Sequence, residues 1–219
     1  MFDFILNLKN LGYEPDCILD IGAFLGNWTE NIRKIYPGSK YYLFEAINYQ
    51  ELSKYDNDPN ITVKNVILND KIETVDWYEE RNSGDSFYKE KTKYFQNTKP
   101  ITKTTIDLDT LIDKDNIIKD DNNIFVKIDC QGAEIPILKG AKKILNRTDF
   151  IILEMPLFGK YNEGVPSFLE HIQFMESINF IPFDVVDKHY INNYNMQIDM
   201  MFINKNHRFN KIVQEKLLI

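Results

Sequence analysis

One stretch of the sequence restricts the possible fold more than any other: residues 17–29, which read Cys-Ile-Leu-Asp-Ile-Gly-Ala-Phe-Leu-Gly-Asn-Trp-Thr. An apolar run leads into Asp20, Gly22 and Gly26 follow, and an amphipathic segment begins at Asn27. This pattern is typical of a buried parallel strand, a glycine turn and a helix, which open a doubly wound α/β sheet. Gly22 permits a sharp turn and close approach of a ligand to the backbone. The alternative is that the glycines serve packing alone.

The spacing of the glycines indicates which kind of ligand this turn would bind. A dinucleotide site has the pattern G-x-G-x-x-G, whose backbone amides face a pyrophosphate. Here the pattern is D-x-G-x-x-x-G, and the carboxylate of Asp20 is a poor neighbour for phosphate. The turn instead suits a ligand that carries an ammonium group and no phosphate. S-adenosylmethionine (SAM), with its amino-acid tail and sulfonium, fits that description.

Further residues are predicted to complete a cofactor site. Glu45 ends the next apolar run about 20 residues after the turn, where an acid typically accepts hydrogen bonds from ribose hydroxyls. Asn69 and Asp70 could approach an adenine edge, although local backbone bonding in a turn explains the pair equally well. Trp28 could shield the cofactor. The predicted cofactor contacts are Asp20, Gly22, Ala23, Gly26, Asn27, Trp28, Glu45, Ala46, Asn69, Asp70 and Cys130.

Length and composition indicate one globular domain. The chain has 219 residues, of which 43% are hydrophobic, enough to bury a proper core. We therefore expect a single domain over residues 1–219, with an N-terminal helix at 2–11 packed on the sheet. The formal net charge of -7 argues against a nucleic-acid surface, which normally requires a basic footprint.

The sequence also favours a soluble protein. No stretch approaches the roughly 20 apolar residues of a membrane span, and the N-terminal residues do not have the pattern of a signal peptide. Cys17 and Cys130 have no metal-site spacing and are interpreted as core thiols. We expect a cytoplasmic protein in a reducing compartment. The oligomeric state is left open.

Apolar runs alternate with amphipathic segments along most of the chain, which predicts a three-layer α/β sandwich. The last two predicted strands should close a mostly parallel sheet as an antiparallel pair. Residues 80–100 form a long irregular excursion, and such loops are usually functional or mobile. The predicted strands are 17–21, 41–45, 61–68, 75–78, 124–128, 150–153, 183–186 and 198–203, with an edge strand and turn at 104–111. The predicted helices after the first are 27–36, 47–55, 133–145 and 168–177.

Four predicted strands end in a carboxylate: Asp20, Glu45, Asp129 and Glu154. Because the carboxyl ends of parallel strands lie on one rim of a sheet, these acids should converge there. Lys127 precedes Asp129 by two residues, so both side chains share one face of their strand. A buried lysine needs a partner, and we expect it among the acids nearby. A purely structural ion pair is the alternative.

Several segments resemble the FkbM family of SAM-dependent methyltransferases. The resemblance extends in order from residue 15 to about 155, and its most specific part is the signature that begins at Lys127. Ala46 departs from the proline usual in the family, and the Ser83–Ser86 loop matches only loosely. The matching segments are 15–23, 26–29, 43–45, 104–107, 127–134, 138–141 and 152–154. The resemblance implies a Rossmann-like class I methyltransferase fold with a seven-stranded sheet, and O-methylation of sugars, glycans or other small hydroxylated molecules.

Methyl transfer to a hydroxyl requires an acceptor oxygen held close to the methyl carbon and a group that takes the proton. We assign the central catalytic or positioning role to Asp129, with Lys127 and Glu154 setting its charge state. A variant is that Asp129, Glu134 and Glu154 hold a divalent metal, Mg²⁺ or Mn²⁺, because hard cations take oxygen ligands. The sequence leaves base and metal open.

Other residues have weaker assignments. His171 is expected on the surface or in the core, and His189 has the better chance of lining the cleft. Five loop aromatics could stack on a sugar ring, or serve packing: Tyr78, Tyr88, Tyr94, Phe158 and Tyr161.

Two other functions are kept as alternatives. One is a nucleic-acid ribose 2′-O-methyltransferase, which the acidic composition disfavours. The other is a catalytically inactive SAM-binding module, which the intact acids at four strand ends disfavour. An NAD-dependent dehydrogenase is the least favoured function, because the glycine spacing is wrong for it.

Overall fold

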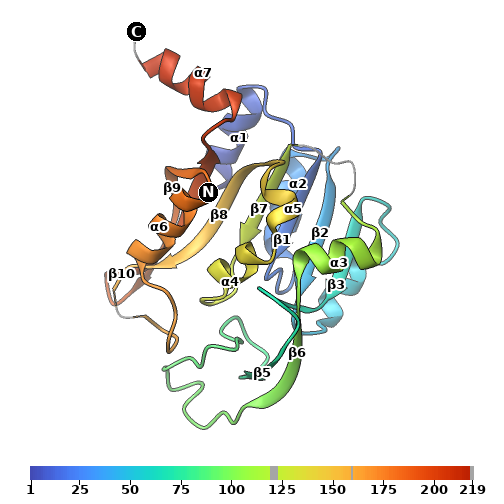
Figure 1. Ribbon diagram of the computed structural model, residues 1–219, viewed down its shortest axis with the longest axis vertical. Helices are drawn as coiled ribbons and strands as arrows, with labels where there is room; N and C mark the ends of the chain where they lie inside the picture. The colour runs from blue at the N-terminus through green and yellow to red at the C-terminus, as the bar shows by residue number, and fades with distance from the viewer. Residues whose placement is uncertain (119–122, 159, 218–219) are drawn as a thin grey trace.

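A seven-stranded sheet forms the centre of the protein (Figure 1). The computed structural model describes residues 1–118, 123–158 and 160–217. The strands are parallel except β10, which runs antiparallel to both of its neighbours. The predicted sheet with an antiparallel C-terminal strand is confirmed. In spatial order the strands are β3 (Ile61–Asn65), β2 (Lys40–Glu45), β1 (Cys17–Ile21), β7 (Ile124–Ile128), β8 (Thr148–Pro156), β10 (Tyr194–Asn204) and β9 (Phe180–Ile191).

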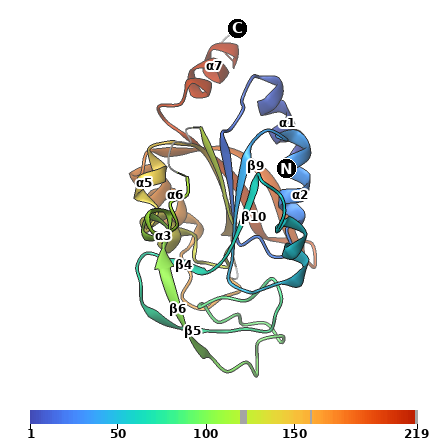
Figure 2. The same cartoon turned by 90° about the vertical axis from the view of Figure 1, so that its right-hand side faces the viewer.

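Helices cover both faces of this sheet (Figure 2), which gives the predicted three layers. One face packs against α1 (Phe2–Asn10), α2 (Asn27–Ile35) and the 3₁₀ helix η1 (Gln50–Tyr55). The other packs against α3 (Leu108–Asp115), α4 (Glu134–Lys139), α5 (Lys142–Leu145) and α6 (Phe168–Ser177). A last helix, α7 (Arg208–Leu217), was not predicted. Among the described residues, no helix combines the length and apolar character that a membrane crossing requires.

The alternation of side chains along β1 explains how one short strand serves two cores. All five of its residues are buried. Ile18 contributes to the core under α1 and α2, whereas Leu19 and Ile21 contribute to the core under α3 to α6. Strands buried on both faces have nearly continuous apolar sequences. Asp20 interrupts the run, and in the sheet register it lies directly opposite Lys127 of β7.

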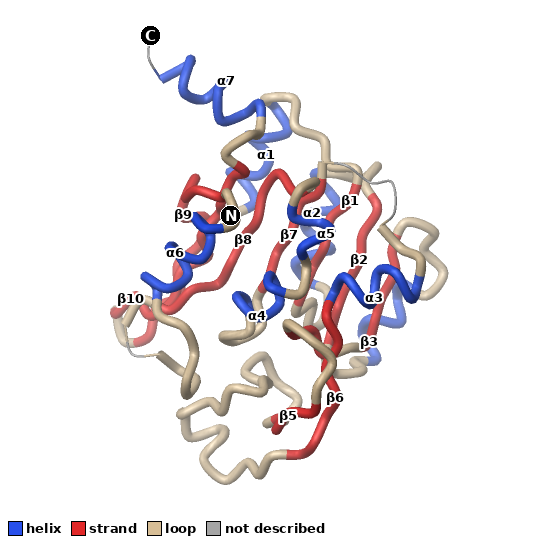
Figure 3. The backbone as a smooth tube through the Cα atoms, viewed as in Figure 1, coloured by secondary structure: helices blue, strands red, loops and turns tan. Residues whose placement is uncertain are grey.

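A second, three-stranded sheet stands at the rim of the first (Figure 3). Its strands are β4 (Ile67–Asn69), β6 (Ile101–Asp107) and β5 (Thr74–Trp77). The predicted single strand 61–68 is wrong in this respect: it divides at Val66, whose amide donates to the Glu45 carbonyl at 2.9 Å. After Val66 the chain leaves the large sheet, and β4 pairs with β6. Between β5 and β6, the predicted excursion is tied down by isolated bridges from Tyr78 to Ser86 and from Glu90 to Asn162.

Two helices differ from prediction. The expected helix 133–145 divides into α4 and α5 around Gly140, where a Cβ would lie 2.5 Å from the Asn69 carbonyl oxygen. The expected helix 47–55 is the shorter 3₁₀ helix η1. Ser167 and Glu170 form a capping box at the N-terminus of α6.

Strand β9 lies at an open edge of the large sheet and is 12 residues long. Its pairing with β10 contains three register shifts, after Asn195, Asp199 and Met201 of β10. Such irregularities bend a strand and increase its local twist.

Gly22 fixes how closely β1 and β7 approach at their carboxyl ends. Its φ angle is +80°, and a Cβ at this position would lie 2.0 Å from the backbone oxygen of Asp129. No side chain fits there without displacing the turn after β7. Glycine is therefore required at position 22 for two reasons: the positive φ angle and the lack of space for a Cβ atom.

Three glycine variants separate these two requirements. We expect Gly22→Ala to lower the free energy of unfolding by about 3 kcal/mol or more, because strain and a backbone clash add. Gly12→Ala should cost about 1 kcal/mol, since Gly12 has φ +90° and open space around it. Gly38→Ala, with open space and no positive φ, should change stability by less than about 0.5 kcal/mol. Denaturant unfolding measures all three, and a Gly22→Ala loss no larger than that of Gly12→Ala would contradict the argument.

Candidate functional site

The carboxylate of Glu45 fastens the turn after β1 to the end of β2. Its two oxygens accept hydrogen bonds from the backbone amides of Phe24, at 2.7 Å, and Ile47, at 2.9 Å. The Gly22 amide donates to the Phe44 carbonyl at 2.9 Å. Burial raises the pKa of Glu45, and the amide hydrogen bonds oppose this shift. The predicted ribose-binding acid is thus held in a fixed orientation.

A cleft opens above these strand ends, which we call the central cleft. It is bounded by the ends of β1 and β2, by residues 82–87 of the excursion and by residues 129–131 after β7. Val66–Leu68 supply an apolar wall. The cleft encloses about 770 Å³ of empty space, its open mouth included. Of the predicted cofactor contacts, it is lined by Gly22, Glu45, Ala46 and Cys130.

A shallow groove continues from Gly22 along the start of α2. The predicted contacts Ala23, Asn27 and Trp28 line this groove, together with Lys127 and Asp129. Two further acids, Asp187 and Asp199, also line it. The groove therefore joins the glycine turn to a strongly acidic region.

Four of the predicted cofactor contacts line neither hollow. Gly26 is the N-cap of α2, where a Cβ would lie 3.0 Å from the Tyr55 ring. Asn69 is buried and donates to Glu73 at 2.9 Å, and Asp70 lies beside Gly140. Asp20 is fully buried beneath the turn. For these residues a direct cofactor contact stays a prediction.

A second cleft lies beside the central one, and we call it the side cleft. It is lined by parts of the excursion together with Asp129, Gln131, Glu154, His189 and Gln197. Asp129 and Gln131 line both clefts, so they form the wall between them. Of the five predicted stacking aromatics, Tyr94 and Tyr161 line the side cleft, whereas Tyr78, Tyr88 and Phe158 are not among its lining residues.

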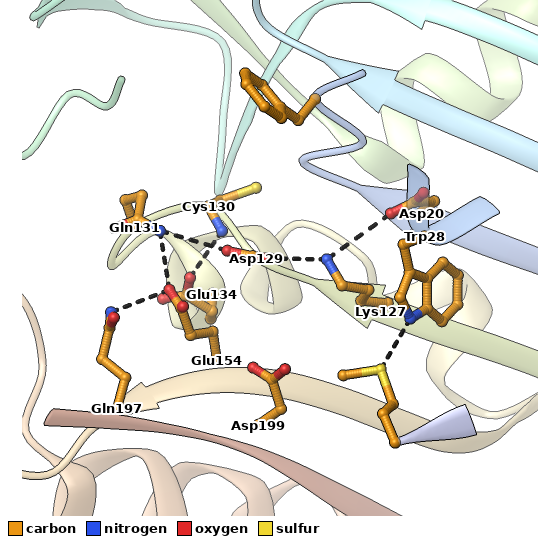
Figure 4. Close-up of polar contacts among 12 residues, drawn as sticks. Asp20, Trp28, Lys127, Asp129, Cys130, Gln131, Glu134, Glu154, Gln197 and Asp199 are labelled. Carbon is orange, nitrogen blue, oxygen red and sulfur yellow. Dashed lines mark hydrogen bonds and ion pairs between the residues drawn. The ribbon is translucent and has the colours of Figure 1, made fainter. Parts of the chain in front are cut away.

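The polar side chains along this wall form a connected chain (Figure 4). Lys127 Nζ lies 3.0 Å from Asp129 Oδ2 and 4.0 Å from Asp20 Oδ1. Gln131 Nε2 donates to Glu154 Oε2 at 2.9 Å and lies 3.4 Å from Asp129 Oδ1. Gln197 Nε2 donates to the same Glu154 oxygen at 3.0 Å. The two glutamines were not predicted as site residues, although Gln131 lies inside the signature segment.

Burial and neighbouring charges move the pKa values of these groups in different directions. Burial alone would lower the pKa of Lys127, but Asp129 and Asp20 outweigh it and the pKa is raised. Burial alone would raise the pKa of Asp129, but the Lys127 charge and hydrogen bond hold it below its usual value. Burial raises the pKa of Glu154 well above its usual value, and the charges of Asp129 and Asp199 add to the shift. Of the two acids, Asp129 is therefore the one that favours the ionised form, and Glu154 is the one that is more readily protonated.

Asp20 is buried beneath the glycine turn and contacts Thr29 and Lys127. Its Oδ2 accepts a hydrogen bond from the Thr29 hydroxyl at 2.6 Å, which joins the end of β1 to α2. Burial raises the pKa of Asp20, and the Lys127 charge opposes this shift. The carboxylate therefore positions Lys127 and the glycine turn.

The structure does not bring the predicted metal ligands Asp129, Glu134 and Glu154 together as a set. Glu134 Oε1 accepts the amides of Cys130, at 3.0 Å, and Gly132, at 3.2 Å. Its Oε2 faces the buried His171, whose Nε2 is 3.7 Å away. Glu134 therefore stabilises the turn after β7, and His171 is a core residue, one of the two places expected for it. Among the described residues, the ligand atoms that do converge belong to Glu154, His189 and Asp199.

Solved structures of methyltransferases share this fold. A methyltransferase FkbM from Methylobacillus flagellatus KT is 14% identical with a TM-score of 0.52, covering 85% of this chain and 43% of that one. A Burkholderia thailandensis 1,6-didemethyltoxoflavin-N1-methyltransferase is 11% identical with a TM-score of 0.53, covering 94% and 77%. The magnesium protoporphyrin IX methyltransferase of Synechocystis PCC 6803 is 7% identical with a TM-score of 0.50, covering 93% and 77%. At these identities the likeness shows the fold alone.

The chain spans less than half the length of the Methylobacillus protein. A comparison with curated proteins finds no match. The model of the methyltransferase FkbM domain, however, matches residues 20–182, well over half of the chain. The chain therefore belongs to the FkbM family of methyltransferase domains.

Proposed function

We propose that the protein is a SAM-dependent O-methyltransferase that acts on a hydroxyl of a sugar, a glycan or another small hydroxylated molecule. The observation that carries this proposal is the position of Asp129, which lines the central cleft, the groove and the side cleft at once. A group at the junction of two binding spaces can contact an acceptor oxygen and lie beside a methyl donor.

The central cleft and the groove together fit the parts of SAM. Glu45 is oriented by two backbone amides and faces the cleft, as an acceptor for ribose hydroxyls should. Val66–Leu68 offer an apolar surface for the adenine. The acids that line the groove suit the ammonium group. Two proteins with the same fold were solved with S-adenosylhomocysteine or SAM bound, which supports this choice of cofactor.

Within this proposal SAM supplies an electrophilic methyl group, and the protein provides position and charge. Asp129 accepts the hydrogen bond, and then the proton, of the acceptor hydroxyl. Lys127 keeps Asp129 ionised, and Gln131 fixes the carboxylate from the other side. The residues of the excursion that line both clefts exclude water from the reacting atoms.

The charge of the side cleft favours a neutral or cationic acceptor. Glu90, Asp129 and Glu154 line it, and His189 is the one basic side chain among its described lining residues. A phosphate-rich acceptor would meet several carboxylates, which disfavours the ribose of a nucleic acid as the substrate. The rings of Tyr94 and Tyr161 provide surfaces on which a sugar can stack. A small carbohydrate hydroxyl therefore suits the side cleft better than RNA does.

The cofactor assignment is tested by Glu45→Ala. We expect the dissociation constant for SAM to rise at least tenfold, because the variant loses the ribose contact and leaves two backbone amides without an acceptor. Isothermal calorimetry measures the change. Glu51→Ala, which removes an exposed glutamate from η1, is the control and should bind SAM as the wild type does. Equal SAM affinity in Glu45→Ala and the wild type would remove Glu45 from the cofactor site.

The role of Asp129 is tested by Asp129→Asn. We expect kcat/KM to fall at least about a hundredfold, the usual contribution of a proton-accepting group, while SAM affinity stays within about tenfold of the wild type. The measurement requires an acceptor from a screen of glycan hydroxyls with labelled SAM. Asp113→Asn, at an exposed position on α3, is the matched control and should keep full activity. Full activity in Asp129→Asn would exclude the proposed role.

A further inference from the structure

Three carboxylates lie in one row across adjacent strands. In the sheet register Asp199 of β10 is directly opposite Glu154 of β8 on one side and Asp187 of β9 on the other. Directly opposite residues project on the same face, and like charges in that position destabilise a sheet. The proposed function draws on Asp187 and Asp199 as acids near the SAM ammonium group, and it leaves the burial of Glu154 directly opposite Asp199 unexplained.

Two members of the row are buried with little compensation. Asp199 is 5% exposed and Glu154 8%. Figure 4 shows the Asp199 carboxylate facing the site without a contact to the residues drawn. Among the described residues, its one ion pair is with His189 Nε2, at 3.4 Å. Lys127 already pairs with Asp129 and Asp20. Two buried carboxylates that lie directly opposite each other thus share one imidazole, and a bound cation would stabilise this arrangement.

The nearby imidazole indicates which cation would fit. His189 Nε2 lies 3.4 Å from Asp199 Oδ2 and 3.9 Å from Glu154 Oε1, and the buried Nε2 atom has no hydrogen-bond partner. One ligand atom from each residue lies within 4.8 Å of the others. Imidazole nitrogen favours transition metals, whereas Mg²⁺ and Ca²⁺ prefer all-oxygen sites. The geometry points to a site for a divalent transition-metal ion, such as Mn²⁺ or Zn²⁺, held by Glu154, His189 and Asp199.

The location of this site gives the ion a role that rests on the proposed function. Glu154 and His189 line the side cleft, and Asp199 lines the groove near Lys127. Three protein ligands leave coordination positions open to that cleft. An acceptor hydroxyl bound to such an ion would lose its proton to Asp129 more readily than a free hydroxyl.

The site is tested by metal binding in the absence of SAM and acceptor. The full chain is stripped with EDTA, dialysed, and titrated at pH 8 with Mn²⁺ and with Zn²⁺, followed by calorimetry and, for Mn²⁺, by electron paramagnetic resonance. We expect one ion per chain. His189→Ala and Asp199→Asn should each weaken binding at least tenfold. Asp187→Asn is the matched control: it removes the same charge from the same row outside the ligand set, and binding should stay within threefold.

A second readout covers the stability of the variants. Asp199→Asn removes a buried charge, so its Tm without metal should equal or exceed that of the wild type, whereas the rise in Tm on adding metal should disappear. No binding of either ion overturns the site, and so does an Asp187→Asn loss as large as that of Asp199→Asn, since that result indicates diffuse charge attraction. SAM titration of the EDTA-treated protein tests the cofactor assignment separately, so failure of one proposal is distinguishable from failure of the other.

Discussion

The ion pair between Lys127 and Asp129, with Asp20 behind it, is the interaction on which the rest of the site depends. Lys127 is 6% exposed in the middle of the sheet, and a buried ammonium group is tolerated only with close carboxylates. Because Lys127 and Asp20 are opposite each other in the register of β1 and β7, the same contact joins the two central strands. It thereby fixes the glycine turn relative to the turn after β7. One cation therefore holds together the two turns that line the central cleft.

The charges of the site follow from its construction at a sheet rim. The carboxyl ends of parallel strands lie at one edge of the sheet, so the acids that end them gather there. Burial raises the pKa of such an acid, and a nearby cation opposes this shift. Asp129 has such a cation, and Glu154 does not. This difference separates a carboxylate whose pKa is held low from one whose pKa is raised by burial and by neighbouring carboxylates. Gln131 bridges Asp129 and Glu154, so a change in the position or charge of one carboxylate affects the other.

Much of this arrangement could be predicted from local sequence, because apolar runs that end in an acid and a glycine turn are determined over a few residues. The strands at 17–21 and 124–128 and the antiparallel end of the sheet needed no other information. Contacts between distant segments could not be predicted in the same way. Glu134 turns inward, where its second oxygen faces the buried His171 of α6, and the chain leaves the large sheet at Val66 to pair β4 with β6. Asp199 did carry a signal, since an acid within the apolar run 198–203 must be buried.

The register shifts between β9 and β10 have a consequence for how the protein behaves at high concentration. A 12-residue strand at an open edge presents unpaired amides and carbonyls that can recruit a strand from another molecule. The three irregularities keep this edge from being flat, and Asp184, Asp187 and Lys188 are exposed along it. Charge and curvature are the usual means by which sheets resist edge-to-edge aggregation. The segment that supplies His189 to the side cleft thus also protects the solubility of the fold.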